Sequence, residues 1–546
     1  MSDTPTGTSE KPPEKPSEQG GLLLRTLNRI ADIGNKLPDP ITLFVLLATS
    51  VIVLSVIFAG ASEEVVQRDG TVATKTVMSL LSSEGVRWMF ENAIDNFTGF
   101  APLGSVLTVM LGIGVAERSG FITMGLRMLV QSVPKSAITA TVVFAGVMSS
   151  MVADAGYVVL TPLGAVLFAG LKRHPLAGLA AAYAGVSGGF SANLFITGLD
   201  PLLAGLTQEA AVTVDPNYSV TVVCNWYFMV ASTFLITIVG TLVTTRIVEP
   251  MLGEWDPSKA DGEPPSHDEP TDRERKAFAH AAIAAVIMTV LLSLFAVIGD
   301  SPLREPMTED MTVIDSLAPF FHAVELMIAA LFFVPGVVYG VSLGMVKSDR
   351  DVAKMTSDTM ATMGAYIVLA FAAAQFVAFF NWTNLGVITA VRGAGFLESM
   401  GLTGIPLIFG FLIVSSLMNL FVGSASAKWA FMAPIFVPMM MYLGYSPEAV
   451  QATYRVGDSI TNIITPLMPY LPIIIVFAQK YDRDAGLGTL ISAMLPYSIA
   501  FGIAWTIMLG IWFGLDIPLG PDVSTTYVIE AATNAAGGVL EGSGGP

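Results

Sequence analysis

The chain has 546 residues, of which 53% are hydrophobic and 13% are charged, and its mean hydropathy is +0.66. An ordinary soluble domain carries about 25% charged residues, so this composition excludes that class and indicates a protein embedded in lipid. The formal net charge of -17 comes mainly from loops around residues 61–95, 254–274 and 300–315, and it argues against nucleic-acid partners.

Residues 1–37 are polar and rich in proline, so we expect a partly disordered cytoplasmic tail and no cleaved signal peptide. Apolar runs long enough to cross about 30 Å of hydrocarbon then follow along nearly the whole chain. The expected fold class is an all-α polytopic membrane protein. We predict nine full crossings, at residues 38–60, 96–118, 176–208, 219–250, 277–298, 319–345, 356–381, 450–478 and 487–516.

Two further apolar stretches, residues 136–171 and 406–445, are too long for one crossing. Small polar residues interrupt each of them near its middle. Backbone that leaves the helix at this depth is tolerated only when protein buries it or it lines a wet cavity. We therefore predict two re-entrant hairpins. Their central residues are Ser149, Ser150, Asp154 and Gly156 in the first hairpin, and Asn419, Gly423, Ser424 and Ser426 in the second.

The two hairpins enter the membrane from opposite sides in this count, which predicts an inverted repeat. Pro162 and Pro175 are separated by the same 13 positions as Pro434 and Pro447. Inverted repeats with broken helices at the bilayer midplane are typical of secondary transporters. With a gap of three or four residues, the crossing after each hairpin carries matching polar interruptions, at Ser191, Asn193, Thr197 and Pro201 and at Ser459, Asn462, Thr465 and Pro469.

The clusters of lysine and arginine at residues 11–36, 118–135, 172–173, 246–276, 347–354 and 480–483 fall on one side of the membrane in this topology, which predicts a cytoplasmic N-terminus and a periplasmic C-terminus. We expect seven regions. They are the cytoplasmic tail (1–37), scaffold helices (38–135), the first repeat with hairpin 1 (136–250), a cytoplasmic loop (251–276), scaffold and linking helices (277–405), the second repeat with hairpin 2 (406–516) and a periplasmic tail (517–546).

Motifs of ATP-driven pumps and of HExxH-type zinc hydrolases do not occur in the sequence. There is no phosphate-binding loop and no HExxH pair. The single cysteine, Cys224, excludes disulfides and cysteine-based zinc sites within one chain. We therefore expect no enzyme activity, and transport driven by an ion gradient or by the gradient of the substrate.

Arg455, Asp458 and Asn462 fall on one face of a predicted membrane helix. A charge inside the membrane costs about 2.5 to 3.5 kcal/mol on insertion scales, so a functional role is the first hypothesis. Arg455 offers a fork of donors for a carboxylate. The alternative is a structural ion pair between Arg455 and Asp458 that holds two helices together.

Oxygen ligands gather around the second hairpin. Prolines at 466, 469 and 472 free backbone carbonyls, and Asn419 and Gly423 add oxygens at the hairpin tip. With Asp458 they predict a cage for a hard cation, for which Na⁺ is the expected ion and H⁺ the alternative. A glycine hinge with an asparagine cap would use the same residues.

Two other residues have both a functional and a structural interpretation. Asp200, which follows Asn193 and Gly198 at a predicted helix break, binds a cation or proton or caps the next helix. Trp429 offers a flat apolar face to an aromatic substrate, or it serves as packing. Together with Arg455 it predicts a ligand that has an aromatic ring and an acid group.

The sequence resembles the p-aminobenzoyl-glutamate transporter (AbgT) family over residues 20–520. The resemblance rests on the strings PDPITLFVLL, SANLFITGLDPLLAG, GSASAKWAFMAPIFVPMM and YRVGDSITNIITPLMPYLP. It implies a dimer with nine helices and two hairpins per subunit. It also implies functional positions at Asp200, Ser426, Trp429, Pro447, Arg455, Asp458 and Pro466, and Na⁺ ligands at Asn419, Gly423 and Asp458.

We therefore expect a cation-coupled secondary transporter of small aromatic and acidic solutes, working by elevator-like alternating access in a bacterial inner membrane. In this hypothesis Trp429 stacks on the substrate ring, Arg455 pairs with a carboxylate, and Ser424 and Ser426 bond the amide. Asn193 and Asn462 complete the predicted transport site. The alternatives are a proton-driven exporter of sulfonamide-type antimetabolites and, less favoured, a passive channel.

Overall fold

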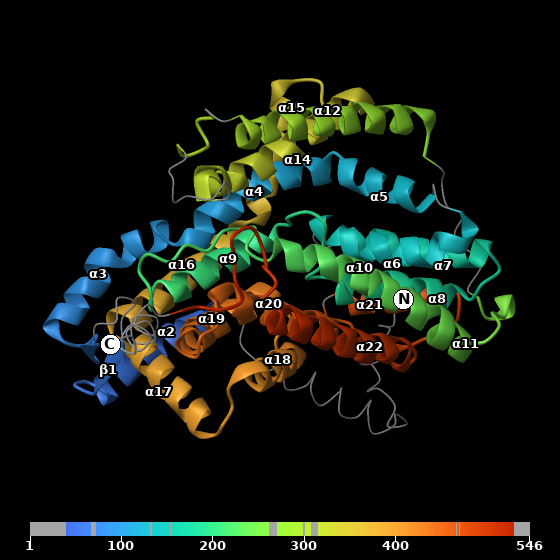
Figure 1. Cartoon of the computed structure of the whole chain (residues 1–546). Helices are drawn as coiled ribbons and strands as arrows, with labels where there is room; N and C mark the ends of the chain where they lie inside the picture. Colours follow the sequence, from blue (N-terminus) through green and yellow to red (C-terminus); the bar gives the residue numbers. More distant parts are fainter. Residues whose placement is uncertain are drawn as a thin grey trace, which may run out of the picture.

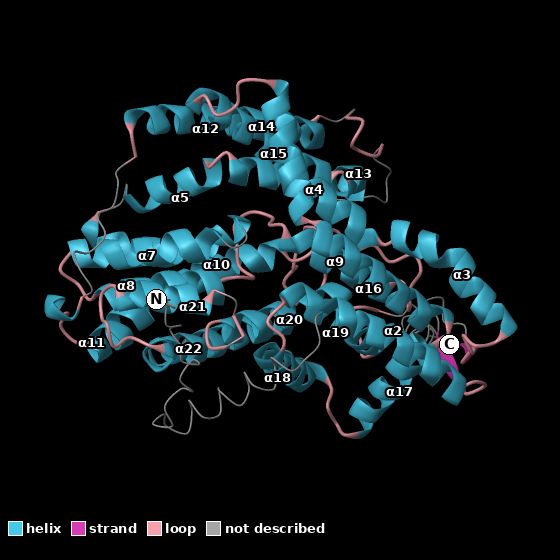
Figure 2. Ribbon diagram, turned by 180° about the vertical axis from the view of Figure 1, so that it is seen from behind, coloured by secondary structure: helices cyan, strands magenta, loops and turns pink. Residues whose placement is uncertain are grey.

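The computed structural model describes residues 40–66, 72–131, 134–152, 155–260, 270–298, 301–306, 315–465, 467–468 and 470–528. The predicted tail 1–37 and residues 529–546 of the predicted C-terminal tail lie outside this part. Helices build almost all of it (Figures 1 and 2). Seven helical stretches among the described residues are long and apolar enough to cross a membrane. They are Ser83–Arg118, Trp226–Leu252, Asp272–Val297, Val324–Leu343, Gly364–Trp382, Gly404–Phe421 and Leu487–Gly514. The prediction of a multi-pass helical membrane protein is confirmed at this level.

A small antiparallel sheet adds to the predicted all-α fold. Strands β1 (Ser62–Val66) and β2 (Val72–Thr76) pair in the loop after α2 (Pro40–Ile57). Their valines and threonines favour extended backbone. Arg392 of α17 (Leu385–Ser399) donates to Glu63 at 2.6 Å and joins this sheet to the helices.

One layer of the molecule is a helical scaffold, at the top of Figure 1. It contains α4 (Ala101–Arg118), α5 (Phe121–Gln131), α12 (Asp272–Val297), α14 (Val324–Leu343) and α15 (Asp349–Thr362). Helices α4 and α14 pack backbone to backbone, because a Cβ added at Gly112 would lie 2.0 Å from the carbonyl oxygen of Ala329. On the other side of α4, α3 (Ser83–Thr98) and α16 (Gly364–Trp382) pack together and lead to α2.

Both predicted hairpins have a helix break close to where the sequence places it. In the first, α6 (Ile138–Met148) ends in a 3-10 turn at Ser149–Val152 before α7 (Ala155–Gly170), and Asp154 lies outside the described residues. In the second, α18 (Gly404–Phe421) and α19 (Ala425–Tyr442) are separated by residues 422–424. Pro162 lies inside α7 and Pro434 inside α19, in agreement with the predicted register.

Two segments predicted as single crossings are each two helices. Helix α8 (Pro175–Tyr183) ends in a π turn (Ala184–Gly188), and break 1, residues 189–198, separates it from α9 (Leu199–Ala211). Helix α20 (Pro447–Asn462) is separated from α21 (Leu471–Gln479) by break 2, residues 463–470. Glycines and small polar residues in break 1, and prolines in break 2, explain why the helices stop.

Three further boundaries differ from the prediction. The segment 356–381 is divided at Met363 between α15 and α16, because the residues of α15 are too polar for a crossing. Helices α5 and α17 were not predicted as elements. Their lengths, 11 and 15 residues, are too short for a full crossing, which is why a search for long apolar runs passes over them.

The two hairpin regions interlock. The second helix of each hairpin contacts the helix beyond the break in the other half, so α7 packs on α21 and α19 packs on α9. Helices α10 (Trp226–Val243) and α22 (Leu487–Gly514) pack against each other beside them. Ser191 of break 1 donates its backbone N–H to Ser459 Oγ of α20 at 3.2 Å. The fold therefore brings residues near position 200 next to residues near position 455.

Candidate site at the two helix breaks

Helix α20 is the centre of the site, and each of its 16 residues, from Pro447 to Asn462, is buried. It carries both charged residues of the predicted transport face, Arg455 and Asp458. These charges therefore face protein and not lipid, as expected for intramembrane charges with a function. The predicted site residue Pro447 begins the helix, with Ser446 as its N-cap.

Arg455 pairs with Asp200 across the two halves of the chain. Its NH2 group donates to Asp200 Oδ1, and the two side chains are 2% and 1% exposed. Asp200 also accepts bonds at Oδ2 from the backbone N–H and the hydroxyl of Thr197, at 2.6 and 2.9 Å. Asp200, in the first turn of α9, thus neutralises Arg455 and fixes the backbone at Thr197 just before the helix; the N-cap of α9 is Gly198, so Asp200 is not the cap, and a role in binding a transported cation or proton stays a prediction.

The remaining donors of Arg455 have weak partners or none. NH1 lies 3.5 Å from Met229 Sδ, a weak acceptor, and Nε has no hydrogen-bond partner although it is buried. A buried donor without an acceptor costs about 1 to 3 kcal/mol. Arg455 is therefore able to accept a further anionic ligand without first breaking a strong bond.

Asp458 pairs with Lys428, a residue that the sequence analysis did not select. The ammonium of Lys428, in the first turn of α19, donates to Asp458 Oδ1 and to Asn419 Oδ1, and both partner side chains are buried. Asn462 donates to Asp458 Oδ2 at 3.1 Å. We call Asn419, Lys428, Asp458 and Asn462 the ion cluster.

The ion cluster is completed by the amide of Asn419. This group donates to the backbone oxygen of Asp458 and to the side-chain oxygens of Thr461 and Asn462, at 2.7, 2.8 and 2.8 Å. The amide thereby ties the tip of hairpin 2 to the end of α20. Three residues of the predicted transport and Na⁺ sites, Asn419, Asp458 and Asn462, therefore lie together.

Arg455 and Asp458 each find a partner on another element, α9 and α19 respectively. The alternative of an ion pair between these two residues is therefore wrong for this arrangement. They are three positions apart on α20, but Asp200 and Lys428 approach the helix from different neighbours. The sequence pattern gave the shared face but not the partners.

Trp429 is fully buried and stacks on Tyr454, with ring centroids 4.6 Å apart. Its indole N–H donates to Thr207 Oγ1 at 2.9 Å and to the backbone oxygen of Leu203 at 3.2 Å. Thr207 in turn donates to Gln451 at 2.6 Å. In this conformation the ring of Trp429 packs between α9 and α20, and its role toward a substrate stays a prediction.

The other predicted residues lie at the breaks. Asn193 of break 1 donates to Ser150 of hairpin 1 at 2.9 Å. Ser424 caps α19 through Ala427 N at 3.3 Å and lies 3.3 Å from Ser426 Oγ. Gly423 packs against break 2, since a Cβ there would lie 3.0 Å from the backbone oxygen of Leu467. Pro466 lies outside the described residues.

The side chains predicted to bind Na⁺ offer oxygen atoms that suit a monovalent cation. No group of three or more His, Cys, Asp or Glu side chains that could hold a metal occurs in the described ranges, so a site for a multivalent metal is not indicated there. Asn419 Oδ1 and Asp458 Oδ1 converge, and an amide oxygen with one carboxylate suits a monovalent cation. Both oxygens accept from the Lys428 ammonium, which takes the place of such a cation in this arrangement.

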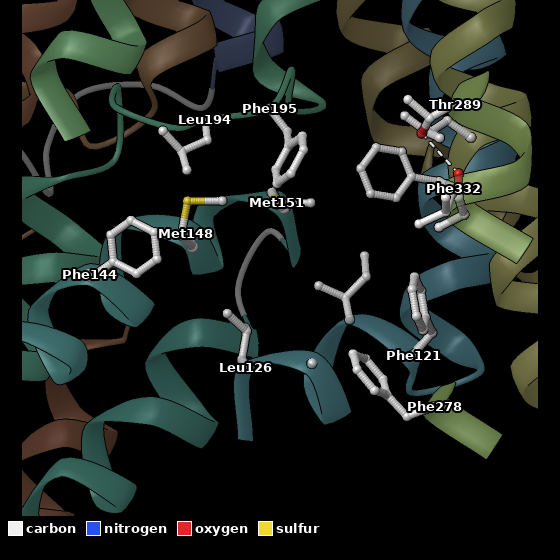
Figure 3. Close-up of a pocket in the computed structure, with 15 residues that line it drawn as sticks. Phe121, Leu126, Phe144, Met148, Met151, Leu194, Phe195, Phe278, Thr289 and Phe332 are labelled. Atoms are coloured by element: carbon white, nitrogen blue, oxygen red, sulfur yellow. Dashed lines mark hydrogen bonds between the residues drawn. The ribbon is translucent and has the colours of Figure 1, made fainter. Parts of the chain in front are cut away.

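A separate cavity of about 540 Å³ lies between the scaffold and hairpin 1 (Figure 3). Phe121 and Phe278 line it from the scaffold, and Met148, Met151 and Phe195 line it from the hairpin region. Its one hydroxyl-bearing residue, Thr289, bonds to the backbone of its own helix at 2.9 Å. This apolar cavity offers nothing to an acidic group, so it is distinct from the charged site.

Lys428 had a signal in the sequence. It is the only Asp, Glu, Lys or Arg between Glu398 and Glu448, inside the apolar stretch read as hairpin 2. A charge there demands a partner by the same reasoning that selected Asp458. Thr207 and Gln451 had no comparable signal, because neither side chain carries a charge that demands a buried partner.

The interlocked broken helices with buried charges between them define a multi-pass membrane transporter of small molecules. The sequence matches the AbgT putative transporter family over residues 25–527. It is 37% identical over 508 residues to the p-aminobenzoyl-glutamate transport protein of Escherichia coli K12, a match that covers 93% of this chain and 97% of that protein. The chain belongs to the AbgT transporter family, and it is therefore a transporter and not an enzyme.

Two solved structures have the same fold. The YdaH transporter of Alcanivorax borkumensis is 43% identical, with a TM-score of 0.82, and the match covers 89% of this chain and 100% of that one. MtrF of Neisseria gonorrhoeae, from a class of antimetabolite efflux pumps, is 45% identical, with a TM-score of 0.86, and the match covers 92% of this chain and 100% of that one. The family match over residues 25–527 includes both hairpin segments and both breaks of this chain.

Proposed function

We propose that the chain is a cation-coupled secondary transporter of small aromatic acids of the p-aminobenzoyl-glutamate type. In this proposal it has nine crossings and two re-entrant hairpins in an inverted repeat. It works as a homodimer in a bacterial inner membrane, with a cytoplasmic N-terminus and a periplasmic C-terminus. The reciprocal contacts of α7 with α21 and of α19 with α9 support the repeat.

The observation that carries the substrate proposal is the incomplete bonding of Arg455. Its guanidinium is buried and bound to one carboxylate, while Nε has no acceptor and NH1 has only a thioether. A planar fork with free donors suits a carboxylate of the substrate. Trp429 and Tyr454 stack on each other beside Arg455. In this proposal, a movement of hairpin 2 exposes these rings, and the aromatic ring of the substrate then stacks on them.

Binding of p-aminobenzoyl-glutamate to purified protein tests this assignment. Arg455→Ala should weaken binding about tenfold to a hundredfold, since a hydrogen bond to a charged group contributes about 1.5 to 3 kcal/mol. Arg392→Ala removes an exposed arginine that pairs with Glu63 and should bind normally. Equal affinity of the Arg455→Ala variant and the wild type would reject the role of Arg455.

The control ligand separates the two parts of the substrate. p-Aminobenzamide keeps the ring and amide but lacks the glutamate carboxylates. Its weaker binding should be the same in the wild type and in Arg455→Ala, because the arginine has no carboxylate to recognise. If Arg455→Ala weakens both ligands equally, the residue supports the fold of the site and not the acid group.

Alternating access in this proposal moves the hairpin region against the scaffold. The apolar cavity between them supports this, because an interface without cross-layer hydrogen bonds at the cavity can slide at low cost (Figure 3). We propose Na⁺ as the coupling ion, with H⁺ as the alternative, because one carboxylate and one amide oxygen of the ion cluster suit a monovalent cation.

Export is the second candidate function, favoured by the 45% identity to MtrF. The same arginine would bind the acidic or sulfonamide group of an antimetabolite, so the site alone does not set the direction. Protection of cells against a sulfonamide by the wild type but not by Arg455→Ala would support export. Accumulation of labelled p-aminobenzoyl-glutamate in the same cells would support import.

A further inference from the structure

Lys428 lies where the sequence analysis expected a free cation. Its ammonium reaches Asn419 Oδ1 and Asp458 Oδ1, the side-chain oxygens proposed as Na⁺ ligands. We propose that Lys428 is the resident cation of the ion cluster and competes with Na⁺ for these two oxygens. This inference rests on the proposed cation coupling, and it adds the residue that sets how tightly the site holds an external ion.

The charges at the ion cluster leave room for only one cation. The salt bridge of Lys428 is with Asp458, and both side chains are at most 1% exposed. The second oxygen of Asp458 accepts from the neutral amide of Asn462. One carboxylate therefore balances one positive charge, and two cations at the same oxygens would leave one of them buried without a partner. Lys428 and a free cation exclude each other from this position.

The start of α19 does not require a lysine. Lys428 lies in the first turn of α19, where the positive end of the helix dipole disfavours a cation. In the register that aligns Pro162 with Pro434, the matching residue of hairpin 1 is Gly156. A Cβ at Gly156 would lie 2.2 Å from Ser149 Oγ, so the other hairpin has no room for a side chain there. Lys428 is therefore specific to the ion cluster and is not a feature that both hairpins share.

A purely structural ion pair between α19 and α20 would also hold Lys428 at Asp458. The two roles differ in what Na⁺ does. A structural pair predicts that removing the lysine lowers stability whatever the salt. Competition predicts that removing it opens the oxygens to Na⁺, so that Na⁺ then stabilises the folded protein more strongly.

Thermal unfolding of purified protein, titrated with NaCl against choline chloride at constant ionic strength, tests the proposal. Lys428→Met keeps the length of the side chain and removes its charge. We expect its half-saturating Na⁺ concentration to be at least tenfold lower than that of the wild type. Lys428→Arg keeps the charge and should stay close to the wild type. Lys480→Met removes an exposed lysine and reports any general effect of charge.

The double variant Lys428→Met with Asp458→Asn locates the effect, because it should lose the gained Na⁺ dependence. Equal half-saturation in the wild type and in Lys428→Met overturns the proposal. If Lys428→Met does not fold, Lys428→Gln, whose amide can still donate to Asp458, is measured by equilibrium binding of radioactive Na⁺. It should also bind Na⁺ at least tenfold more tightly, and unchanged binding overturns the proposal.

Failure of the Lys428 proposal and failure of the proposed cation coupling give different results. If the variants bind Na⁺ equally while uptake by the wild type is driven by a Na⁺ gradient, the role of Lys428 is wrong and the proposed coupling stands. If uptake responds to neither a Na⁺ nor a pH gradient, the proposed coupling itself fails, whatever Lys428 does to Na⁺ binding.

Discussion

Replacing Asp200 by asparagine removes the counter-charge of Arg455 while keeping an oxygen that can accept from Thr197. In the wild type the carboxylate accepts from Arg455 at Oδ1 and from the backbone and hydroxyl of Thr197 at Oδ2. The variant leaves a guanidinium that is 2% exposed beside a neutral amide. Loss of one partner of a buried ion pair costs about 3 to 5 kcal/mol.

The double variant Asp200→Asn with Arg455→Met shows whether this cost comes from the stranded charge. Removing both charges leaves no buried ion, so its destabilisation should be smaller than the sum of the two single variants. Residues in direct contact show coupling energies of about 0.5 to 3 kcal/mol, and a buried ion pair belongs at the upper end. We expect a coupling energy of about 2 to 3 kcal/mol.

Unfolding in mixed detergent micelles, followed by tryptophan fluorescence, measures the three variants against the wild type. Thr197→Ala serves as the matched control, because it removes one hydrogen bond to Asp200 and leaves the ion pair in place. Its cost should be about 1 kcal/mol. Strictly additive losses in the cycle would refute the argument that Asp200 and Arg455 stabilise the junction of α9 and α20 as a pair.

Three further tests concern helix packing and the contact between Asp516 and Thr525. Gly457→Ala places a Cβ 2.7 Å from the hydroxyl oxygen of Ser415 on α18, so it should lower the free energy of unfolding in detergent by about 1 to 3 kcal/mol. The control is Gly410→Ala on α18, whose Cβ meets no atom within 4 Å and should change that free energy little. Trp429→Phe keeps an aromatic ring but loses the indole bond to α9, and should lower the free energy of unfolding by about 1 to 3 kcal/mol, less than Trp429→Ala, in the same assay. After the end of α22, Asp516 accepts hydrogen bonds from the backbone N–H of Thr525, at 3.1 Å, and from its hydroxyl. The hydroxyl holds the pKa of Asp516 below its usual value of 3.8, so this contact is fully stabilising above that pH and weakens as the pH falls through the lowered pKa. Amide exchange at Thr525, corrected for intrinsic rates, should therefore rise at low pH, and an exchange rate that stays at its neutral-pH level would show that the contact does not depend on the charge of Asp516.

The sequence was sufficient to predict elements whose signal is local. The breaks in both hairpins follow from polar and glycine residues inside apolar runs, and the burial of Arg455 and Asp458 follows from the cost of charge in lipid. The break at residues 189–198 was read only as an interrupted crossing, because the length of the run suggests one helix and local composition does not say how far a helix unwinds.

The sequence does not predict which residues far apart in the chain contact each other. Arg455 and Asp200 are 255 positions apart, and only the interlocking of α9 with α19 and α20 brings them together. Trp429 was expected to present an open face, but its stacking on Tyr454 depends on that same packing. Lys428 was within reach of the sequence, since a lone charge in a long apolar stretch indicates a buried partner.

The most direct test of the transport proposal is uptake of p-aminobenzoyl-glutamate into proteoliposomes, with Na⁺ and pH gradients imposed separately and substrate placed on either side. We expect gradient-driven accumulation by the wild type, and none by an Arg455→Ala variant that still folds and unfolds cooperatively. Equal accumulation by that variant, or transport by the wild type that only ever equalises the substrate concentrations under both gradients, would refute the proposal.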